Sequence, residues 1–238
     1  MQKIEILYQY LNKVNNKRNL KYMEQLAVNN QDMLSMGFKD SLNAYFTHGP
    51  RSSKRTDILN EFIENIVKQA IKSKYGEENM NHYSIKKEYA VKSTTKSGKK
   101  NCDVVVLKDD VPHIIFPIKF CMTNYSQNCY NYWENSTGEV SHLKWANPDV
   151  HIVPVNILMN KIPYLKKDNT IKHWEVVTYE NSFKIYENLA KHKLVHNNYN
   201  VILEVNHTCG LGERFDKVPE IVNIVENMPF NVILTEII

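Results

Sequence analysis

The first 50 residues have apolar side chains at helical spacing, in residues 4–11 and again in residues 20–27. Apolar residues that recur at intervals of three and four lie on one face of a helix. We therefore predict a helical region over residues 1–50, packed on or beside the rest of the protein. The dipeptide Gly49-Pro50 is expected to end it as a loop.

A wide apolar face predicts a helix over residues 57–75. The next three segments, residues 82–95, 100–108 and 112–121, are rich in β-branched residues and are separated by short polar connections. Short connections join strands that run in opposite directions. These segments therefore predict a three-stranded antiparallel meander.

After the meander, helical spacing returns over residues 124–136, or as far as residue 145, and Gly138 is expected to interrupt this helix. The apolar run at residues 149–158 predicts a strand that pairs in parallel with an earlier one, because no tight turn precedes it. The remaining chain predicts a helix over residues 182–192, a strand over 201–205, a helix over 218–226 and a strand over 232–237.

The composition is that of an ordinary globular protein, with 42% hydrophobic and 24% charged residues among 238. This length fits one large domain over residues 51–238, with the helical region 1–50 attached to it. No apolar run reaches the roughly 18 residues that span a bilayer, and the N-terminus does not resemble a signal peptide. We therefore expect a cytoplasmic protein with no membrane association.

Charge is divided unevenly along the chain. Residues 1–100 contain 18 Lys and Arg against 10 Asp and Glu, whereas residues 101–238 contain 12 against 16. A basic half that faces a polyanion, with metal-binding carboxylates in the acidic half, would produce this division. Lys-rich helices that face solvent would produce it equally well. The four cysteines include no CxxC pair, so free thiols are expected in place of a zinc ribbon or a disulfide framework.

One carboxylate and one lysine lie on neighbouring predicted strands. Asp103 opens the apolar run of the second strand, and Lys119 lies near the end of the third. A hairpin through Asp109-Asp110 would bring both to the same end of the sheet. An Asp that can hold a divalent metal, beside a Lys that can orient or deprotonate a water, suits phosphodiester hydrolysis. Isolated pairs of this kind are usually surface residues, so the interpretation depends on the surrounding strand order.

Two basic clusters and one amide-rich stripe are candidate DNA contacts. The cluster before the helix at 57–75 is either a phosphate contact or an exposed loop, and a second cluster forms the turn before the Asp103 strand. The stripe in residues 124–135 is either an exposed polar face or a surface that hydrogen-bonds base edges or phosphates; its start five residues after Lys119 favours the second. The candidates are Arg51, Lys54 and Arg55, then Lys96, Lys99 and Lys100, then Asn124, Gln127, Asn128 and Asn131.

The order helix, three strands, helix, strand over residues 57–160, with Asp103 on the second strand and Lys119 on the third, resembles the PD-(D/E)XK nuclease superfamily. Within it, type II restriction endonucleases look most similar. The resemblance implies an α/β fold with a restriction-endonuclease-like αβββαβ core, in which helices flank a central mixed sheet. It leaves residues 161–238 as an α/β extension. It also implies that Asp103 binds a catalytic Mg²⁺ and that Lys119 assists the attacking water.

The sequence departs from that family at Pro117, where members carry an acidic metal ligand two residues before the lysine. Some members supply this carboxylate from the helix after the third strand, which leaves Glu139 and Glu134 as candidate metal ligands here. The freedom of Gly138 favours Glu139, whereas helical phase favours Glu134. By the same resemblance, Glu64 on the first helix would complete the catalytic set.

The resemblance implies a Mg²⁺-dependent type II restriction endonuclease that hydrolyses double-stranded DNA at a specific short sequence. Such an enzyme is expected to act as a homodimer, so that two sites cut both strands, and to have a companion methyltransferase that protects host DNA. Two alternatives remain. One is a nuclease of the same fold that acts in repair, recombination or RNA cleavage; the other is a catalytically inactive nucleic-acid-binding module, which Pro117 favours.

Overall fold

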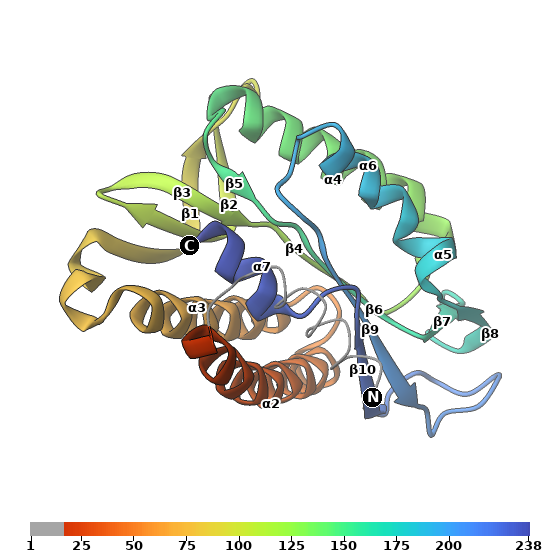
Figure 1. Ribbon diagram of the computed structural model, residues 1–238. Coiled ribbons are helices and arrows are strands. Elements are labelled where there is room, and N and C mark those ends of the chain that lie inside the picture. The colour runs from red at the N-terminus through yellow and green to blue at the C-terminus, as the bar shows by residue number, and fades with distance from the viewer. Residues whose placement is uncertain (1–16) are drawn as a thin grey trace.

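The computed structural model describes residues 17–238, with side chains from residue 33 onward, and shows β-sheets with helices on both faces (Figure 1). The predicted helix at residues 4–11 lies outside the described residues. The main helices are α2 (Lys17–His48), α3 (Lys54–Tyr75), α4 (Tyr125–Ala146) and α7 (Phe230–Ile237), with shorter helical segments η1 (Glu77–His82), α5 (Tyr179–Ser182), η2 (Lys184–Tyr186) and α6 (Glu187–Lys191). The strands are β1 (Tyr83–Lys92), β2 (Lys99–Lys108), β3 (Val111–Phe116), β4 (Ile118–Cys121), β5 (His151–Ile152), β6 (Val155–Met159), β7 (Lys161–Leu165), β8 (Ile171–Val176), β9 (Tyr199–Asn206) and β10 (Glu220–Glu226).

Two four-stranded sheets have the orders β1-β2-β3-β5 and β10-β9-β6-β4. Antiparallel pairing joins β1 to β2, β2 to β3 and β9 to β10, whereas β3 pairs with β5, β4 with β6 and β6 with β9 in parallel. A separate two-stranded hairpin contains β7 and β8. The prediction of mixed sheets flanked by helices is therefore confirmed, as are the antiparallel pairing of the first three predicted strands and the parallel pairing of the fourth. The strands predicted at residues 112–121 and 149–158 are each divided in two, however, and their halves belong to different sheets.

A proline lies at each junction between the two sheets. Pro117 separates β3 from β4, and Pro154 lies between β5 and β6. Backbone hydrogen bonds continue past both junctions, because Val153 N–H donates to Ile115 O at 2.9 Å and Val155 N–H donates to Pro117 O at 2.8 Å. The segment that contains β3 and β4 thus lies beside the segment that contains β5 and β6, and each segment contributes one strand to each sheet.

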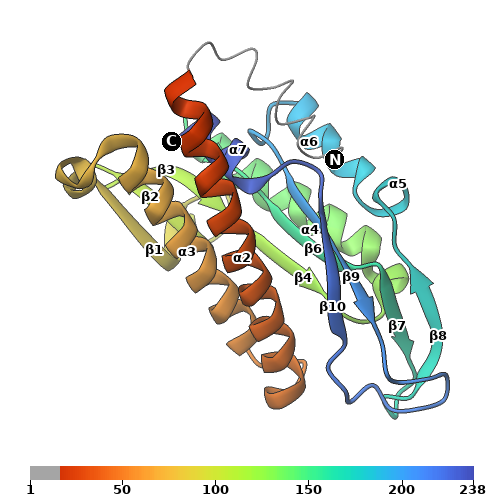
Figure 2. The same ribbon diagram turned by 60° about the horizontal axis from the view of Figure 1, so that its bottom comes forward.

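Helices cover both faces of the first sheet, with α3 on one face and α4 on the other (Figure 1). This explains why residues 104–107 of β2 form an uninterrupted apolar run, each no more than 3% exposed. Neighbouring residues of a strand point to opposite faces, so a strand buried on both faces is apolar at every position. Helix α2 lies beside α3 and also contacts α7 (Figure 2).

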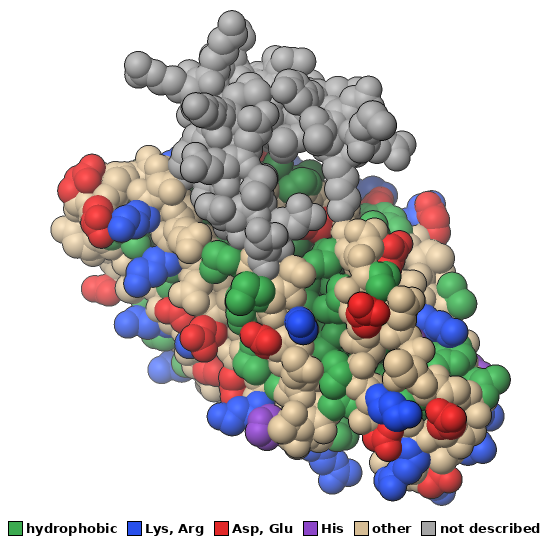
Figure 3. All heavy atoms as spheres, turned by 90° about the horizontal axis from the view of Figure 1, so that it is seen from below, with side chains coloured by type: hydrophobic (Ala, Val, Ile, Leu, Met, Phe, Trp, Pro, Cys, Tyr) green, Lys and Arg blue, Asp and Glu red, His purple; other side chains and the backbone are tan. Residues whose placement is uncertain are grey.

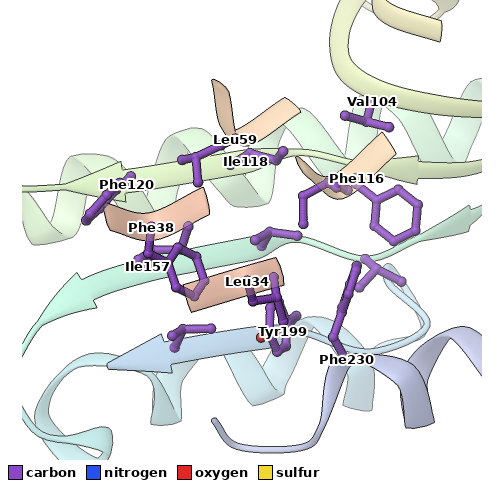
Figure 4. Close-up of a cluster of buried hydrophobic side chains, with 14 of the residues drawn as sticks. Leu34, Phe38, Leu59, Val104, Phe116, Ile118, Phe120, Ile157, Tyr199 and Phe230 are labelled. Atoms are coloured by element: carbon purple, nitrogen blue, oxygen red, sulfur yellow. The ribbon is translucent and has the colours of Figure 1, made fainter. Parts of the chain in front are cut away.

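The core extends from the sheet junction to α2 and α7. Figure 4 shows Leu34 and Phe38 of α2 in the same hydrophobic cluster as Phe116, Tyr199 and Phe230. The Phe230 ring centre lies 4.6 Å from that of Tyr199 and 5.8 Å from that of Phe116. The C-terminal helix therefore packs where the two sheets meet.

Two predictions for the C-terminal segments are wrong. Residues 218–226 were expected to be a helix but contain β10, which pairs with β9 at the sheet edge. Residues 232–237 were expected to be a strand but lie in α7, which follows Pro229 and is apolar on most of its surface. A short segment that is apolar all round carries no period that distinguishes a strand from a helix, so packing decides its structure.

Other boundaries also differ from the sequence prediction. Helix α4 continues through Gly138 without a break, because a single glycine lowers helix stability without ending a helix. The predicted helix at 182–192 is divided among α5, η2 and α6. The strand predicted at 201–205 is confirmed within β9. Within residues 17–238, none of the helices combines the length and the apolarity needed to cross a membrane.

Candidate active site

The strands β2 and β3 separate at Pro117, and Asp103 lies at the point of separation. Their last paired residues at this end are Val104 and Phe116. Proline has no N–H to donate, so Pro117 cannot continue the hydrogen bonds to β2. One carboxylate oxygen of Asp103, Oδ2, instead accepts a hydrogen bond from the Ile118 N–H at 2.6 Å. This contact fixes the Asp103 side chain in the fork between the two strands.

Burial raises the pKa of Asp103 above its usual value. The Ile118 N–H and the Lys119 ammonium partly oppose this effect, whereas the nearby carboxylates of Glu139 and Glu88 add to it. The ionised form of Asp103 is thus stabilised less than in water. A further cation in the fork would favour this ionised form.

Glu139 of α4 lies between two lysines from different strands. Its Oε2 atom is 3.7 Å from Nζ of Lys100 on β2 and 3.7 Å from Nζ of Lys119 on β4. The Glu139 side chain is only 10% exposed, whereas those of Lys119 and Lys100 are 43% and 41% exposed. The structure therefore places Asp103, Lys119 and Glu139 together, and it adds Lys100 to them.

Helix geometry separates the two candidate glutamates. Glu139 follows Glu134 by five positions, which corresponds to about 140° of rotation around a helix with about 100° per residue. Both residues belong to the uninterrupted helix α4, and Glu134 is exposed to solvent. The phase of the helix thus directs Glu139 to the fork. The expectation that a break at Gly138 would direct it there is wrong.

Glu64 is not part of this arrangement. It lies on α3, on the opposite face of the sheet from α4 (Figure 1). Its Oε2 atom is 3.3 Å from Nζ of Lys87 on β1. The structure therefore gives Glu64 a partner outside the fork.

Glu88 is a neighbour of Asp103 that the sequence did not suggest. It lies on β1 between Lys87 and Tyr89, whose strand partners are Val104 and Cys102 on either side of Asp103. Its φ of 48° is uncommon for a residue with a side chain. Its Oε1 accepts a hydrogen bond from the buried Asn60 amide at 3.3 Å. A single residue with positive φ inside a strand leaves no periodic signal in the sequence.

The candidate DNA contacts near α3 differ in exposure. Arg51 and Lys54 are exposed. Arg55 is half-buried, with its guanidinium 5.5 Å from the centre of the Tyr45 ring and one N–H donating to Met122 Sδ at 3.6 Å. Arg51 and Lys54 therefore remain accessible to phosphate, whereas Arg55 has contacts within the protein.

The turn between β1 and β2 presents two of its three candidate lysines to solvent. Lys96 and Lys99 are exposed, whereas Lys100 belongs to the ion pairs of Glu139. The turn contacts the C-terminal half of α4, since Thr94 N–H donates to His142 O at 3.2 Å. This contact places basic side chains beside the helix that carries Glu139.

The amide-rich stripe serves structural and surface roles. Asn124 Oδ1 accepts a hydrogen bond from Leu165 N–H at 2.6 Å, and Asn128 donates to Asn124 O at 2.9 Å. Gln127 accepts a hydrogen bond from the Tyr164 hydroxyl at 3.4 Å, and Asn131 is exposed. Asn124 therefore fixes the β7–β8 hairpin, and Gln127 and Asn131 are the two exposed amides of the four.

The residues of the fork can supply two carboxylates to a metal. Among residues 17–238, no group of three or more His, Cys, Asp or Glu side chains is arranged to hold a metal ion. Mg²⁺ differs from most protein-bound metals in this respect, because one or two carboxylates together with water and substrate phosphate are often sufficient. The pair Asp103 and Glu139 fits this smaller requirement.

Comparisons with known proteins give no independent indication of function. The chain matches no protein-family model, no curated protein and no solved structure. The geometry of the fork is therefore the basis on which a function is proposed below.

Proposed function

We propose that this protein is a Mg²⁺-dependent endonuclease of the type II restriction class, which hydrolyses double-stranded DNA at a specific short sequence. The observation that carries the proposal is the fork at Pro117, where Asp103 and Glu139 share one site with Lys119. The elements from α3 to β6 also support it: when β3 with β4 and β5 with β6 are each counted as one strand interrupted at a proline, their order is the αβββαβ expected of a restriction-endonuclease-like core.

Asp103 and Glu139 are the residues that would hold Mg²⁺. Asp103 uses Oδ2 for the Ile118 N–H, and Glu139 pairs with both lysines through Oε2. When bound, Mg²⁺ would polarise the scissile phosphate and lower the pKa of a coordinated water. Glu139 thus replaces the carboxylate that Pro117 cannot provide.

Lys119 is the residue that would act on the attacking water. Its side chain is 43% exposed and belongs to β4, the strand that leaves the fork. It can donate hydrogen bonds to a water or to a phosphate oxygen, and its charge stabilises the negative charge that develops in the transition state. The distance of 3.7 Å between Lys119 Nζ and Glu139 Oε2 is long for a direct hydrogen bond. A phosphate oxygen can therefore replace Glu139 as the partner of Lys119.

Cleavage of both strands of one site requires two active sites. We therefore propose a homodimer, in which each subunit cuts one strand. A site-specific endonuclease would also cut its host's DNA, so a companion methyltransferase is the partner we propose for protection.

Cleavage of plasmid and phage DNA, with and without Mg²⁺, tests the proposal. Discrete fragments that require Mg²⁺ and are lost in both Asp103→Ala and Lys119→Ala support the restriction class. Nicking or a smear that shows the same dependence supports a repair or recombination nuclease. Cleavage retained in both variants contradicts the site, and DNA binding without any cleavage supports the inactive binding module that Pro117 favours.

A further inference from the structure

A cavity of about 320 Å³ lies between the C-terminal end of α4, strand β5 and the chain segment that joins α6 to β9 (Figure 1). Four of its seven lining side chains carry nitrogen groups: Lys144 of α4, His151 of β5, and Lys193 and His196 of the joining segment. The other three lining residues are small and apolar, and none of the seven has a carboxylate. The volume is that of an ordinary small-molecule site.

The two histidines of the cavity belong to a row of three rings. The centre of the His151 ring lies 5.3 Å from that of His196 and 5.6 Å from that of His113 on β3, with the rings edge to face. Within the described part of the chain, no group of His, Cys, Asp and Glu side chains has an arrangement that could hold a metal ion, and this row is no exception. A neutral imidazole still has one N–H to donate. The row therefore suits a ligand that accepts hydrogen bonds better than it suits a metal.

Lys144 is fixed at the wall of the cavity. Its Nζ donates a hydrogen bond to Val150 O at 2.9 Å, and an ammonium group has three N–H donors, so donors remain for a ligand. Lys144 follows Glu139 by five positions on α4, which corresponds to about 140° around the helix. The cavity and the fork thus lie on different sides of α4.

Burial and neighbouring positive charges oppose the cationic forms of these side chains. Burial lowers the pKa of Lys144, His151 and His196. The pKa of His151 is lowered further by His113 and Lys144, and that of His196 by His151 and Lys144. Burial and then the charge of Lys108 on β2 lower the pKa of His113. An anion in the cavity would offset this repulsion.

Two carboxylates near the cavity act in the opposite sense. Glu236 of α7 has Oε2 at 3.2 Å from His196 Nε2, and the exposed Asp149 partly opposes the effect of burial on the pKa of Lys144. Neither carboxylate lines the cavity. On the face drawn in Figure 3, by contrast, Lys and Arg side chains lie among Asp and Glu side chains. The cavity thus collects positive groups that are incompletely neutralised by the protein.

We propose that this cavity binds a small molecule through its phosphate monoester group. The ammonium groups of Lys144 and Lys193 supply positive charge, and the ring N–H groups of His151 and His196 donate hydrogen bonds to the phosphate oxygens. Two lysines beside two protonatable rings match a dianion better than the single charge of a carboxylate. The inference does not depend on the proposed endonuclease, because a separate set of residues carries it.

Isothermal titration calorimetry tests this site with adenosine 5′-monophosphate (AMP) as the probe and adenosine as its uncharged control. The cavity variant combines Lys144→Met and Lys193→Met, which keep the length of the side chains without their charge. The matched control combines Lys39→Met and Lys172→Met, which are exposed lysines on other elements. Circular dichroism melting verifies folding, and Lys193→Met alone replaces the cavity variant if the double substitution does not fold.

We expect wild type to bind AMP with a Kd below about 1 mM and to bind adenosine at least about tenfold more weakly. The cavity variant should bind AMP at least about tenfold more weakly than wild type, or at least about threefold for Lys193→Met alone, and the control should change by less than about twofold. Asp103→Ala should bind AMP as wild type does, since the fork lies apart from the cavity.

The pH dependence of sulfate binding tests the role of the histidines, because sulfate remains a dianion between pH 5.5 and pH 8. A bound dianion favours the protonated rings, so the complex takes up protons and the affinity for sulfate should rise as the pH falls. In the variant that combines His151→Gln and His196→Gln, this rise should disappear.

Equal affinity for AMP and adenosine would overturn the inference, as would equal AMP affinity of wild type and the cavity variant. Sulfate affinity that does not change with pH in wild type would contradict the role of the histidines. Displacement of AMP by duplex DNA at an equal concentration of phosphate groups would also overturn the inference, because the cavity would then be a contact for the DNA backbone.

Discussion

Asp103 occupies a site in which its ionised form is unfavourable. Its pKa is raised mainly because it is buried, and one hydrogen bond from Ile118 does not compensate fully. Functional sites commonly hold ionisable groups whose charge costs stability in the absence of a ligand. At the residue scale, the fork therefore has the electrostatics of a site that gains from a bound cation.

The first prediction concerns the stability and activity of Asp103→Asn. Asparagine can still accept the Ile118 N–H but carries no charge, so its Tm at pH 7 should equal or exceed that of wild type while DNA cleavage is lost. An acid whose pKa is higher in the folded than in the unfolded protein lowers the free energy of unfolding at pH values above its folded-state pKa. This destabilisation disappears as the pH falls below the pKa of the unfolded state, about 3.9. The difference in unfolding free energy between wild type and Asp103→Asn should therefore shrink from pH 7 to pH 4, as measured by urea denaturation. A lower Tm for the variant at pH 7 would contradict this account.

The second prediction separates the two glutamates of α4. Glu139→Gln should reduce DNA cleavage by at least about 100-fold, because it removes one of two carboxylates from the fork. Glu134→Gln is the matched control on the same helix and should cleave at the wild-type rate, since Glu134 is exposed away from the fork. Single-turnover cleavage and duplex binding are measured for both. Equal rates for the two variants would rule out Glu139 as the second carboxylate.

At the scale of elements, α4 links the fork to the hairpin. Its first turn is capped by Glu175 of β8, its middle carries Glu139, and its second half contacts the β1–β2 turn through His142. In an uninterrupted helix, each residue is rotated by about 100° from the one before, so the direction of every side chain is fixed relative to the others. The direction of Glu139 thus depends on the continuity of α4 through Gly138.

The third prediction tests that continuity. A Cβ added at Gly138 meets no atom within 4 Å, so Gly138→Ala should stabilise the protein by about 0.5–1 kcal/mol without reducing cleavage. The control Gly98→Ala also has open space, but Gly98 has a φ of 69°, so this substitution should destabilise. Thermal melts and cleavage rates check both variants. Loss of cleavage in folded Gly138→Ala would indicate that the site requires a flexible helix.

At the scale of the whole molecule, the two sheets are held together by packing at their junction. Phe230 of the C-terminal helix is 1% exposed and lies against Tyr199 of one sheet and Phe116 of the other. The fork with Asp103 is at the same junction, one residue from the end of the pairing between β2 and β3. The stability of the site therefore depends on a helix that begins more than 100 residues after Asp103 in the sequence.

The fourth prediction measures this dependence. Phe230→Ala should lower the free energy of unfolding by about 3–5 kcal/mol, because it leaves a cavity between the sheets. Val176→Ala is a suitable control, since Val176 is 70% exposed and should change stability by less than about 0.5 kcal/mol. Urea denaturation provides both values. A loss below about 1 kcal/mol for Phe230→Ala would show that α7 contributes little to the junction.

Local patterns in the sequence determined the order of elements from α3 to β6, because helices and strands that are buried on a defined face have a clear period. They also placed Asp103 and Lys119 near one another, since a short hairpin constrains which strands are neighbours. Within the C-terminal third, the strand at residues 201–205 was predictable, whereas β10 and α7 were not. Both are short segments whose structure depends on the partner that they pack against.

Only the tertiary structure decided which glutamate lies next to Lys119. The answer depends on the directions in which Glu134 and Glu139 point around α4, and the sequence did not show that this helix continues past Gly138. It also decided that Glu64 pairs with Lys87, that Asn124 fixes a hairpin, and that Glu88 lies beside Asp103. Contacts of this kind join residues from separate elements, and their register is set by packing across the sheet. The chain itself specifies the chemistry available at the fork, while its three-dimensional packing selects the side chains that meet there.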